Sequence, residues 1–259
     1  WSGPELGEGK HTIVFDFNAA IDSPQVHNTL DAAAPTSTMS PLPPITEGTT
    51  FTTAWSGQDD AGGSGIANYD VYVSVDGGPD VLLFENATAT SVSLTGEEGH
   101  TYAFYTVASD NVGHVEARPS SPQAVTTIAD RTAPILANVP ADQTVEATSP
   151  AGAAVTFTPP TAADNVDPAP SVVCLPASGS TFPLGATTVT CTATDDWDNT
   201  ASATFTVTVV DTTAPSFTNL PMDQTLEATS AAGAVFTFAP VSAIDAVDQS
   251  PVVSCDVES

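Results

Sequence analysis

The sequence predicts an all-β protein built from tandem immunoglobulin-like β-sandwich domains. Short segments of alternating apolar and polar residues are separated by turn residues, which is typical of strands half-buried in a sheet. Gly and Pro are frequent, with 17 and 22 copies, and long helix-forming residues are scarce. The third observation is an internal repeat with an offset of 81 positions. A unit of this length is one small domain, because the repeating units of solenoids are shorter.

The two copies of the repeat align without a gap. We expect one complete domain at residues 131–213 and an incomplete second copy at residues 214–259. The aligned pairs include Asp130 with Asp211, Glu146 with Glu227, Phe157 with Phe238, Asp164 with Asp245 and Cys174 with Cys255.

Residues 1–33 hold one clear alternating segment, residues 11–17, which by itself cannot bury a core. We expect this region to be the closing strands of a preceding domain or an extension of the next one. Asp31 is the first residue of a D-x-x-A-P motif that recurs at Asp130 and Asp211. All three positions are therefore interpreted as joints between domains.

Residues 34–130 form a module with a different internal pattern. About seven short strands separated by turns are typical of an immunoglobulin-like sandwich. Residues 76–78 (DGG) are a strong hairpin signal. Alternating segments lie at residues 51–55, 69–75, 81–84, 91–94, 101–107 and 124–128.

This module resembles the fibronectin type III-like domains of large secreted microbial proteins over roughly residues 35–129. The similar motifs are WSG at 55–57, GI at 65–66, YDVY at 69–72, GHTY at 99–102 and SDNVG at 109–113. The resemblance implies a sandwich fold in a secreted protein and says little about function.

The 131–213 unit alternates in the same manner and resembles the hyalin-repeat (HYR) domain. The motifs that carry the resemblance are FPLG at 182–185, VTC at 189–191, Asp195 and NTA at 199–201, and the alternating segments lie at 143–147, 153–157, 171–174, 187–193 and 203–209. The family implies an immunoglobulin-like fold, an extracellular location and a role in adhesion. Asp198 stands where the family has Gly, so this turn either is built differently or carries an extra ligand.

Charge excludes one class of partner. The sequence contains three Lys and Arg residues in total but 31 Asp and Glu residues, which gives a formal net charge of −28. Such a chain repels phosphate backbones and anionic membranes, so we expect no nucleic acid partner. No run of eighteen apolar residues occurs, and we expect no direct membrane insertion in this segment.

Cys174 and Cys191 fall within one repeat, and we predict a disulfide between them. Cys255 is the next copy of Cys174, and its own partner would fall beyond residue 259. A disulfide in each repeat indicates an oxidising, extracellular or cell-surface location. Closing such a loop contributes about 3 kcal/mol.

Carboxylates gather in turns and joints, where two interpretations remain open. Ca²⁺ takes six to eight oxygen ligands from flexible loops, and clustered Asp and Asn supply them. The alternative is that these side chains cap turns by accepting hydrogen bonds from their own backbone. The candidate Ca²⁺ ligands are Asp59, Asp60, Asp110, Asp130, Asp164, Asn165, Asp167, Asp195, Asp196, Asp198 and Asp211.

Catalysis finds little support, and we predict that the segment is not an enzyme. The four histidines are scattered, and neither an HExxH nor a GxSxG motif occurs. Trp55 lies in an alternating strand and is expected in the core, whereas Trp197 lies in a turn and is the candidate for glycan binding. Asn86 opens the N-glycosylation sequon.

The sequence therefore predicts a non-catalytic extracellular structural or adhesive protein, whose tandem modules form a stalk, surface fibre or adhesin shaft. Its expected partners are other copies or further repeats of the chain and a cell-surface protein or glycan. Two alternatives stay open. One is an accessory region of a secreted hydrolase, acting as a spacer or binding glycan, and the other is a subunit of a head-to-tail filament completed by strands of another chain.

Overall fold

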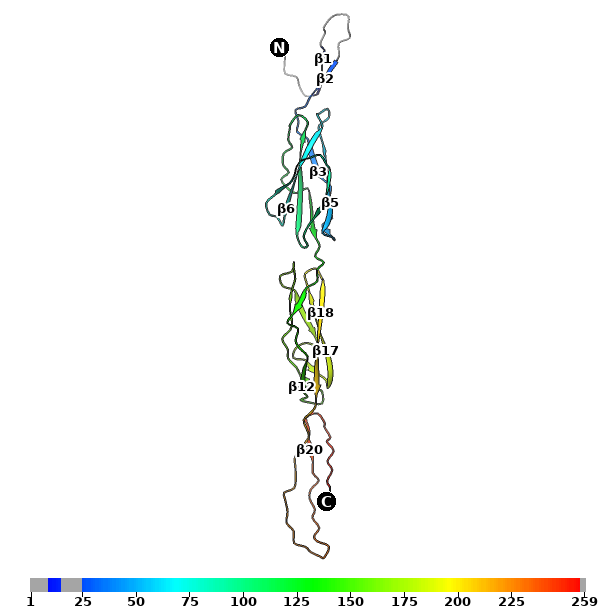
Figure 1. Cartoon of the computed structure of the whole chain (residues 1–259), viewed down its shortest axis with the longest axis vertical. Helices are drawn as coiled ribbons and strands as arrows, with labels where there is room; N and C mark the ends of the chain where they lie inside the picture. Colours follow the sequence, from blue (N-terminus) through cyan, green and yellow to red (C-terminus); the bar gives the residue numbers. More distant parts are fainter. Residues whose placement is uncertain (1–8, 15–24, 257–259) are drawn as a thin grey trace. The chain divides into compact units, whose positions relative to one another are not determined.

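The chain folds into β-strands joined by turns. The structure is a computed structural model that describes residues 9–14 and 25–256, and within these residues it contains strands and no helix. The prediction of an all-β fold is thus confirmed. The described part of the chain also offers no helix with the length and apolarity needed to cross a bilayer. Two compact units divide the chain, Trp1–Arg131 (unit 1) and Thr132–Ser259 (unit 2), and their strands are coloured along the sequence in Figure 1.

Unit 1 opens with an antiparallel strand pair. Strand β1 (Gly9–Val14) pairs with β2 (Gln25–Leu30). The alternating segment predicted at residues 11–17 is therefore a strand as far as Val14, and its last three residues lie outside the described residues.

Two sheets form the body of unit 1. One has three strands in the order β3-β5-β8 and the other has five in the order β4-β10-β9-β6-β7. All neighbours are antiparallel except β4 and β10, which run parallel. The strands are β3 (Thr36–Met39), β4 (Ile45–Thr46), β5 (Thr50–Gln58), β6 (Ile66–Val75), β7 (Val81–Ala87), β8 (Ser91–Thr95), β9 (Thr101–Asp110) and β10 (Ala124–Ile128).

The hairpin predicted after β6 is present. Asp76 and Gly77 have φ angles of 52° and 69°. Two consecutive positive φ angles fit the right-handed twist of the flanking strands, and Gly is the residue that adopts them without strain.

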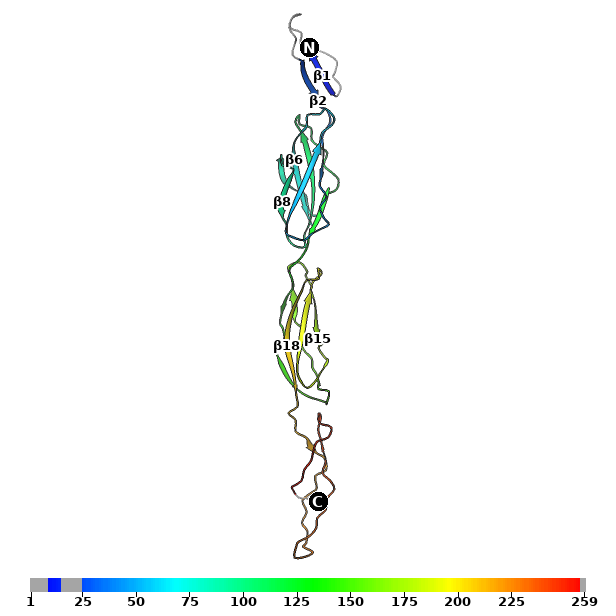
Figure 2. The same cartoon turned by 90° about the vertical axis from the view of Figure 1, so that its right-hand side faces the viewer.

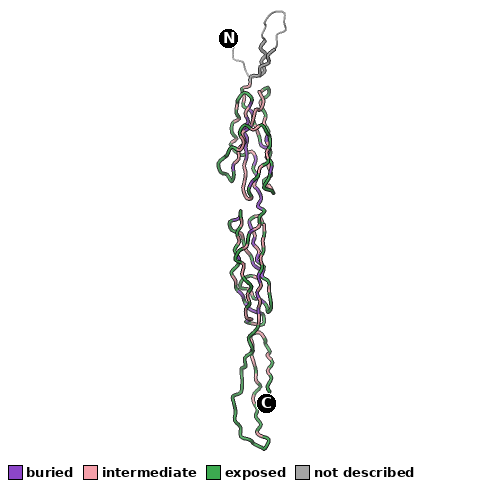
Figure 3. Tube along the Cα trace, viewed as in Figure 1, coloured by how far each residue is buried: buried purple, intermediate pink, exposed green. Residues whose placement is uncertain are grey.

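The apolar faces of the two sheets of unit 1 enclose one core. Trp55 is 3% exposed and contacts Tyr69 edge to face, with ring centroids 6.4 Å apart, so its predicted place in the core is confirmed. Phe104 in β9 and Val71 in β6 are fully buried. Figure 3 shows buried segments along these strands. Apolar residues occur at every second position of these strands, so their side chains lie on the same face of the sheet.

Unit 2 is built on a four-stranded sheet in the order β12-β18-β17-β15, and β15 and β18 are labelled in Figure 2. Strand β12 runs parallel to β18, and the other neighbours are antiparallel. Phe182 and Val189 are fully buried in its core. The strands of the sheet are β12 (Gln143–Glu146), β15 (Ser171–Leu175), β17 (Gly185–Thr194) and β18 (Thr200–Val210).

Two short strand pairs complete the sandwich of unit 2. Strand β11 (Ile135–Ala137) pairs with β14 (Thr161–Ala163), and β13 (Ala153–Ala154) pairs with β16 (Thr181–Phe182). The glycine at 152 is required here, because a Cβ atom would stand 1.8 Å from the Phe182 carbonyl oxygen.

The strand predicted over residues 153–157 is wrong beyond Ala154. The chain continues beside the turn at residues 177–180 through separate hydrogen bonds, in which the Gly179 amide donates to the Val155 carbonyl at 2.8 Å and the Phe157 amide donates to the Ser178 hydroxyl at 2.9 Å. Residues 155–157 therefore bond to a turn and to a serine side chain and have no continuous partner strand. The alternation of apolar and polar residues in the sequence does not predict which partner a segment has.

Residues 214–256 repeat the local geometry of the first half of the 81-residue unit. Strand β19 (Ser216–Phe217) pairs with β20 (Ala243–Ile244), as β11 pairs with β14, and the bridge between Ser230 and Gly233 matches that between Ser149 and Gly152. Most side chains of this segment are exposed, including Val235 and Val252 (Figure 3).

Candidate functional site

The predicted disulfide is present. Cys174 in β15 and Cys191 in β17 are direct cross-strand partners, and their sulfur atoms are 2.05 Å apart. Both residues are buried in the core of unit 2. Cys255 is free and exposed.

In unit 1, acidic side chains gather around Asp31, which follows β2. We call Asp31, Asp59, Asp60, Asp110 and His114 the Asp31 cluster. Oxygen atoms of Asp31, Asp59 and Asp60 lie within 4.8 Å of one another, and the same limit holds among ligand atoms of Asp31, Asp110 and His114. The structure thus joins three predicted ligands with two that were not predicted, Asp31 and His114. Asp31 begins a D-x-x-A-P motif, and this motif is the sequence signal that could have added Asp31 to the predicted ligands.

The side chains of Asp31 and Asp110 have no exposed surface. Asp110 Oδ1 accepts hydrogen bonds from the amides of Val112, Gly113 and His114, at 2.9, 2.7 and 2.8 Å. Its Oδ2 lies 2.8 Å from His114 Nδ1. Turn capping, one of the two interpretations of these carboxylates, therefore accounts for the position of Asp110.

Hydrogen bonding also keeps these carboxyl groups ionised. The Ser64 amide, which donates to Asp31 Oδ2 at 2.8 Å, is the main cause that holds the pKa of Asp31 below its ordinary value. Burial raises the pKa of Asp110, but the hydrogen bonds from His114, Val112 and Gly113 outweigh it, and the net pKa is lowered. The cluster therefore presents buried negative charge at neutral pH.

Asp59 completes one side of the Asp31 cluster. Its Oδ1 accepts a hydrogen bond from the Asp60 amide at 2.9 Å and its Oδ2 one from the Gly65 amide at 2.6 Å. These bonds fix the loop after β5 so that its carboxylates face Asp31. Such a set of oxygens, reached from three separate loops, matches the donor preference of Ca²⁺.

A second group of predicted ligands lies in unit 2. Asp164 Oδ1 accepts hydrogen bonds from the amides of Val166 and Asp167, at 2.9 and 3.0 Å. Its Oδ2 is inaccessible to solvent and has no hydrogen-bond partner in the described structure. A carboxylate oxygen of Asp164 lies within 4.8 Å of one of Asp195.

Asp195 organises the turn after β17. Its Oδ1 accepts hydrogen bonds from the amides of Trp197 and Asn199, both at 2.8 Å. Burial raises the pKa of Asp195, but the hydrogen bonds from Asn199 and Trp197 hold it below its ordinary value. Asp167 ties this turn to the Asp164 loop, since its Oδ2 accepts a hydrogen bond from the Asp196 amide at 3.1 Å.

Asp198 has a φ angle of 64°, the left-handed conformation that favours Gly. The turn thus keeps the backbone that glycine would give it, although Asp replaces glycine here. The Asp198 side chain is exposed and joins none of the carboxylate groups found among the described residues.

The remaining predicted site residues differ in how far they are exposed. Trp197 is only half-buried, and Asn86 is exposed, as an N-glycosylation site must be. Among the remaining candidate ligands, Asp130 is buried, whereas Asn165, Asp196 and Asp211 are exposed.

Comparison with known proteins identifies one module. Residues 129–209 match the HYR domain. The resemblance inferred from the sequence is therefore confirmed for this part of the chain. HYR domains are typically extracellular and non-catalytic, and the buried disulfide agrees with such a location.

A curated relative is Endoglucanase B of Cellulomonas fimi, which is 35% identical over 115 residues. The match covers 42% of this chain and 11% of that protein, so the chain spans only a small part of its relative.

Two solved structures are similar to this chain at low sequence identity. The fibronectin(III)-like modules of CbhA from Clostridium thermocellum are 12% identical, with a TM-score of 0.27, and the match covers 68% of this chain and 95% of that one. Mouse cadherin-23 EC22-24 is 14% identical, with a TM-score of 0.40, and the match covers 70% and 69%.

Proposed function

We propose that this chain is part of an extracellular stalk, surface fibre or adhesin shaft made of tandem HYR and fibronectin type III-like modules. The observation that carries the proposal is the parallel pairing of an early strand with the last strand of each sandwich. In unit 2 these strands are β12 and β18, with Gln143 opposite Val207 and Glu146 opposite Val210. In unit 1 they are β4 and β10.

A parallel pair formed by an early strand and the last strand suits a protein that carries tension. A force that separates the two ends of such a unit pulls the two strands in opposite directions along their axes. Every hydrogen bond of the pair is then loaded at once, and none can break alone as in an unzipping hairpin. This geometry resists extension better than an antiparallel terminal pair does.

In each sandwich, side-chain hydrogen bonds also join the end of the early strand to the segment that follows the last strand. In unit 2, Glu146 accepts hydrogen bonds from Thr212 and Thr213, which follow β18. In unit 1, Arg131 Nη1 donates to Glu47 Oε2 at 2.7 Å, so the residue after β4 holds the segment after β10. In each module a glutamate thus accepts a hydrogen bond from the segment that follows the last strand, although the exposed Arg131–Glu47 pair contributes little to stability.

The Asp31 cluster supports a further part of the proposal, that Ca²⁺ stiffens the shaft. The side chains of Asp31 and Asp110 are two carboxylates without exposed surface; hydrogen bonds and His114 Nδ1 offset part of the cost of burying them, and a bound cation would offset more of it. Asp59 and Asp60 add further oxygens. Extracellular Ca²⁺ sites typically have millimolar affinity, which matches the surroundings of such a protein.

Pulling single molecules of the full chain tests the load-bearing proposal. We expect two distinct unfolding events of high force, one for each sandwich. The disulfide locks the 17-residue separation between Cys174 and Cys191, so a reductant should lengthen the extension of unit 2 by about 60 Å, at about 3.6 Å per residue. Unfolding of both units without a resolvable force peak would contradict the proposal.

A second candidate function is an accessory region of a secreted hydrolase. The observation that favours it is the similarity to Endoglucanase B, whose name describes an enzyme that this chain matches over 11% of its length. In that case the modules space or bind substrate for a catalytic domain. Sequencing the gene on both sides of these residues discriminates the two, because a neighbouring catalytic domain would favour the accessory role.

A further inference from the structure

Residues 214–256, which we name the half-unit, expose side chains whose aligned residues in the HYR module are buried. Val155 is 4% exposed, whereas its aligned residue Phe236 is 39% exposed. Cys174 is buried in the core of the module, whereas its aligned residue Cys255 is exposed. The half-unit therefore presents the inner face of a sandwich without the strands that cover it (Figure 3).

In the HYR module the cover is the antiparallel pair β17–β18. Val189 and Phe205 of this pair belong to the same core cluster as Val155 and Cys174. The pair also lies at the centre of the sheet, where β12 bonds to β18 on one side and β15 bonds to β17 on the other.

The two outer strands of that sheet have no equivalent in the half-unit. Residues 224–227 align with β12 and residues 252–256 align with β15, and neither segment is a strand in the described structure. Both segments lack a strand pair between them, so their backbone groups and the apolar face stay open. Such an open edge pairs with an added strand through main-chain hydrogen bonds.

The same chain carries a strand pair that has no further neighbour. Strands β1 and β2 form a sheet of their own and pair with no other strand among the described residues. An isolated two-stranded sheet is marginally stable in water, and packing against a larger apolar face stabilises it. The β1–β2 pair is thus a strand pair without a sheet, and the half-unit is a sheet face without a strand pair.

The sequence around β1–β2 matches the sequence around β17–β18. Strand β2 ends one residue before the D-x-x-A-P motif at Asp31, and β18 ends one residue before the same motif at Asp211. A Leu-Gly dipeptide at residues 6–7 precedes Ile13, as the Leu-Gly dipeptide at residues 184–185 precedes Cys191 with the same spacing. The β1–β2 pair therefore has the flanking motifs of the strand pair that the half-unit lacks.

Charge favours contact between these two segments. Strands β1 and β2 include Lys10, one of the three Lys and Arg residues of the chain, and neither strand contains Asp or Glu. The half-unit contains no Lys or Arg, and its carboxylates lie at positions 223, 227, 245, 248 and 256. Contacts between other acidic surfaces of two copies are repulsive, so the difference in charge selects this pairing.

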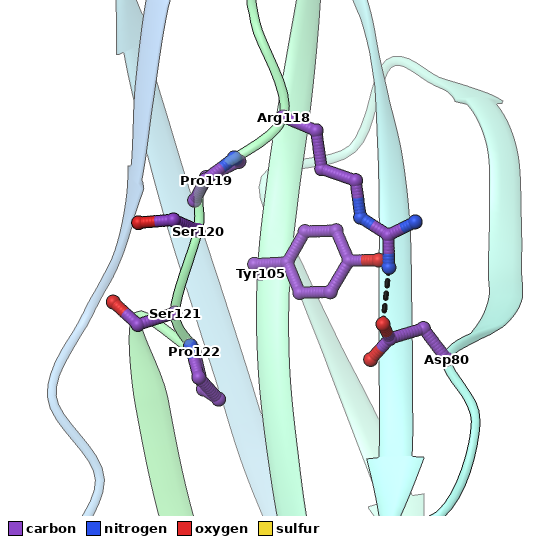
Figure 4. Close-up of a pocket in the computed structure, with 7 residues that line it drawn as sticks. All are labelled: Asp80, Tyr105, Arg118, Pro119, Ser120, Ser121 and Pro122. Carbon is purple, nitrogen blue, oxygen red and sulfur yellow. Dashed lines mark hydrogen bonds and ion pairs between the residues drawn. The ribbon is translucent and has the colours of Figure 1, made fainter.

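The outer face of the five-stranded sheet in unit 1 is, by contrast, occupied by its own side chains (Figure 4). The Arg118 guanidinium carbon lies 4.6 Å from the centre of the Tyr105 ring and 5.3 Å from that of Tyr72. The same guanidinium forms an ion pair with Asp80. These groups have their partners within unit 1, and we place the contact between copies at the half-unit.

We propose that the β1–β2 pair of one copy of this chain binds the half-unit of a second copy and takes the place that β17–β18 has in the HYR module. Strand β2 adds parallel to residues 224–227, and β1 adds antiparallel to residues 252–256, as β18 and β17 do with β12 and β15. Each copy gives one strand pair and receives another. Such a heterologous contact adds copies head to tail into rings or filaments.

This inference goes beyond the load-bearing role of the two sandwiches and does not depend on it. The force measurement is made on single chains, whereas the measurements below follow association between chains. The two proposals can therefore succeed or fail separately.

The first test is sedimentation velocity of the full chain between about 1 μM and about 1 mM, the range of moderate to weak binding. Cys255→Ser is the parent chain here, so that a disulfide between two Cys255 thiols does not add to the measured mass. We expect the average mass to rise with concentration beyond that of a dimer. Phe236→Asp, which puts a charge on the open face, should abolish this rise. Val173→Asp is the matched control, because Val173 is 59% exposed on β15 of the HYR module, and it should associate as the parent chain does.

The second test is disulfide linkage between copies. Ile13→Cys puts a thiol at the position that matches Cys191, and Cys191 is the direct cross-strand partner of Cys174. On oxidation we expect a ladder of linked chains on a non-reducing gel, with the new thiol joined to Cys255 of another copy, as peptide mass spectrometry identifies. Thr12→Cys is the matched control, since neighbouring strand positions face opposite sides, and it should give no such ladder.

Four results would overturn the inference. The chain could stay monomeric up to about 1 mM, in which case another segment covers the half-unit. Phe236→Asp could associate as strongly as Val173→Asp. The two cysteine variants could give equal ladders, or the new thiol of Ile13→Cys could join Cys255 of the same chain.

Discussion

Glu146 accepts hydrogen bonds from both the amide and the hydroxyl of Thr212, at 2.7 and 2.9 Å. The glutamate ends β12 and the threonine lies just beyond β18, so one carboxylate spans the parallel pair of strands at its open end. The Thr212 amide is the main cause that holds the pKa of Glu146 below its ordinary value, and the carboxylate is therefore charged at neutral pH.

Replacing this carboxylate should weaken unit 2 against force. In Glu146→Gln the negative charge is lost and one oxygen becomes an amide nitrogen, which cannot accept the hydrogen bond that Oε2 accepts from the Thr212 hydroxyl. We expect a lower unfolding force for unit 2 and a melting temperature lower by a few degrees. Glu227→Gln, at the aligned position of the next repeat, is the control and should change neither. Equal unfolding forces for the two variants would remove the assigned role of Glu146.

Calcium should stabilise unit 1 through the Asp31 cluster. If the site has the millimolar affinity typical of extracellular modules, 10 mM Ca²⁺ adds about 1.4 kcal/mol to the free energy of unfolding. Calorimetry of the full chain with and without EDTA measures this. Asp59→Asn should abolish the gain, whereas Asp223→Asn, an exposed carboxylate outside the cluster, should retain it. A melting curve that calcium leaves unchanged would refute cation binding at this cluster.

Acid should destabilise unit 1 by protonating Asp31 and Asp110. The pKa of both carboxyl groups is lower in the folded chain than the ordinary value of 3.8, so their contribution is fully present above that value. It is lost as the pH falls below about 4 and through the folded pKa values. Urea unfolding between pH 3 and pH 7 should show this loss, and Asp110→Asn should make the profile flatter. A stability that rises on acidification in this window would contradict the sign.

Asp198 offers a test of backbone strain. Since its φ of 64° favours glycine, Asp198→Gly should raise the free energy of unfolding by about 1 kcal/mol. Asp196→Gly is the matched control in the same turn. Asp196 has no positive φ, so this change should lower stability by making the unfolded chain more flexible. Urea unfolding at neutral pH measures both, and a loss of stability in Asp198→Gly would show that the aspartate side chain holds the turn.

Features carried by neighbouring residues could be predicted from the sequence. Alternation placed Trp55 in the core because strand geometry alone turns every second side chain inward. The hairpin at Asp76 and Gly77 followed from local backbone preference. The disulfide followed from the position of Cys174 and Cys191 within one repeat.

Features that depend on tertiary contacts could not be predicted. Asp31 meets Asp110 across 79 positions of sequence, and only the folded sandwich brings the two loops together. The strand expected over residues 153–157 failed for the same reason, since its neighbour in space is a turn.

The corner at Gly152 recurs at the aligned glycine of the next copy. Its counterpart Gly233 keeps a φ of 104° although no atom lies within 4 Å of its Cβ position, whereas at Gly152 the Phe182 carbonyl occupies that space. Hydrogen bonds between Ser230 and Gly233, at 3.0 and 3.2 Å, are sufficient to form the corner. The corner therefore depends on hydrogen bonds between neighbouring residues, and packing against residues later in the repeat is not what forms it.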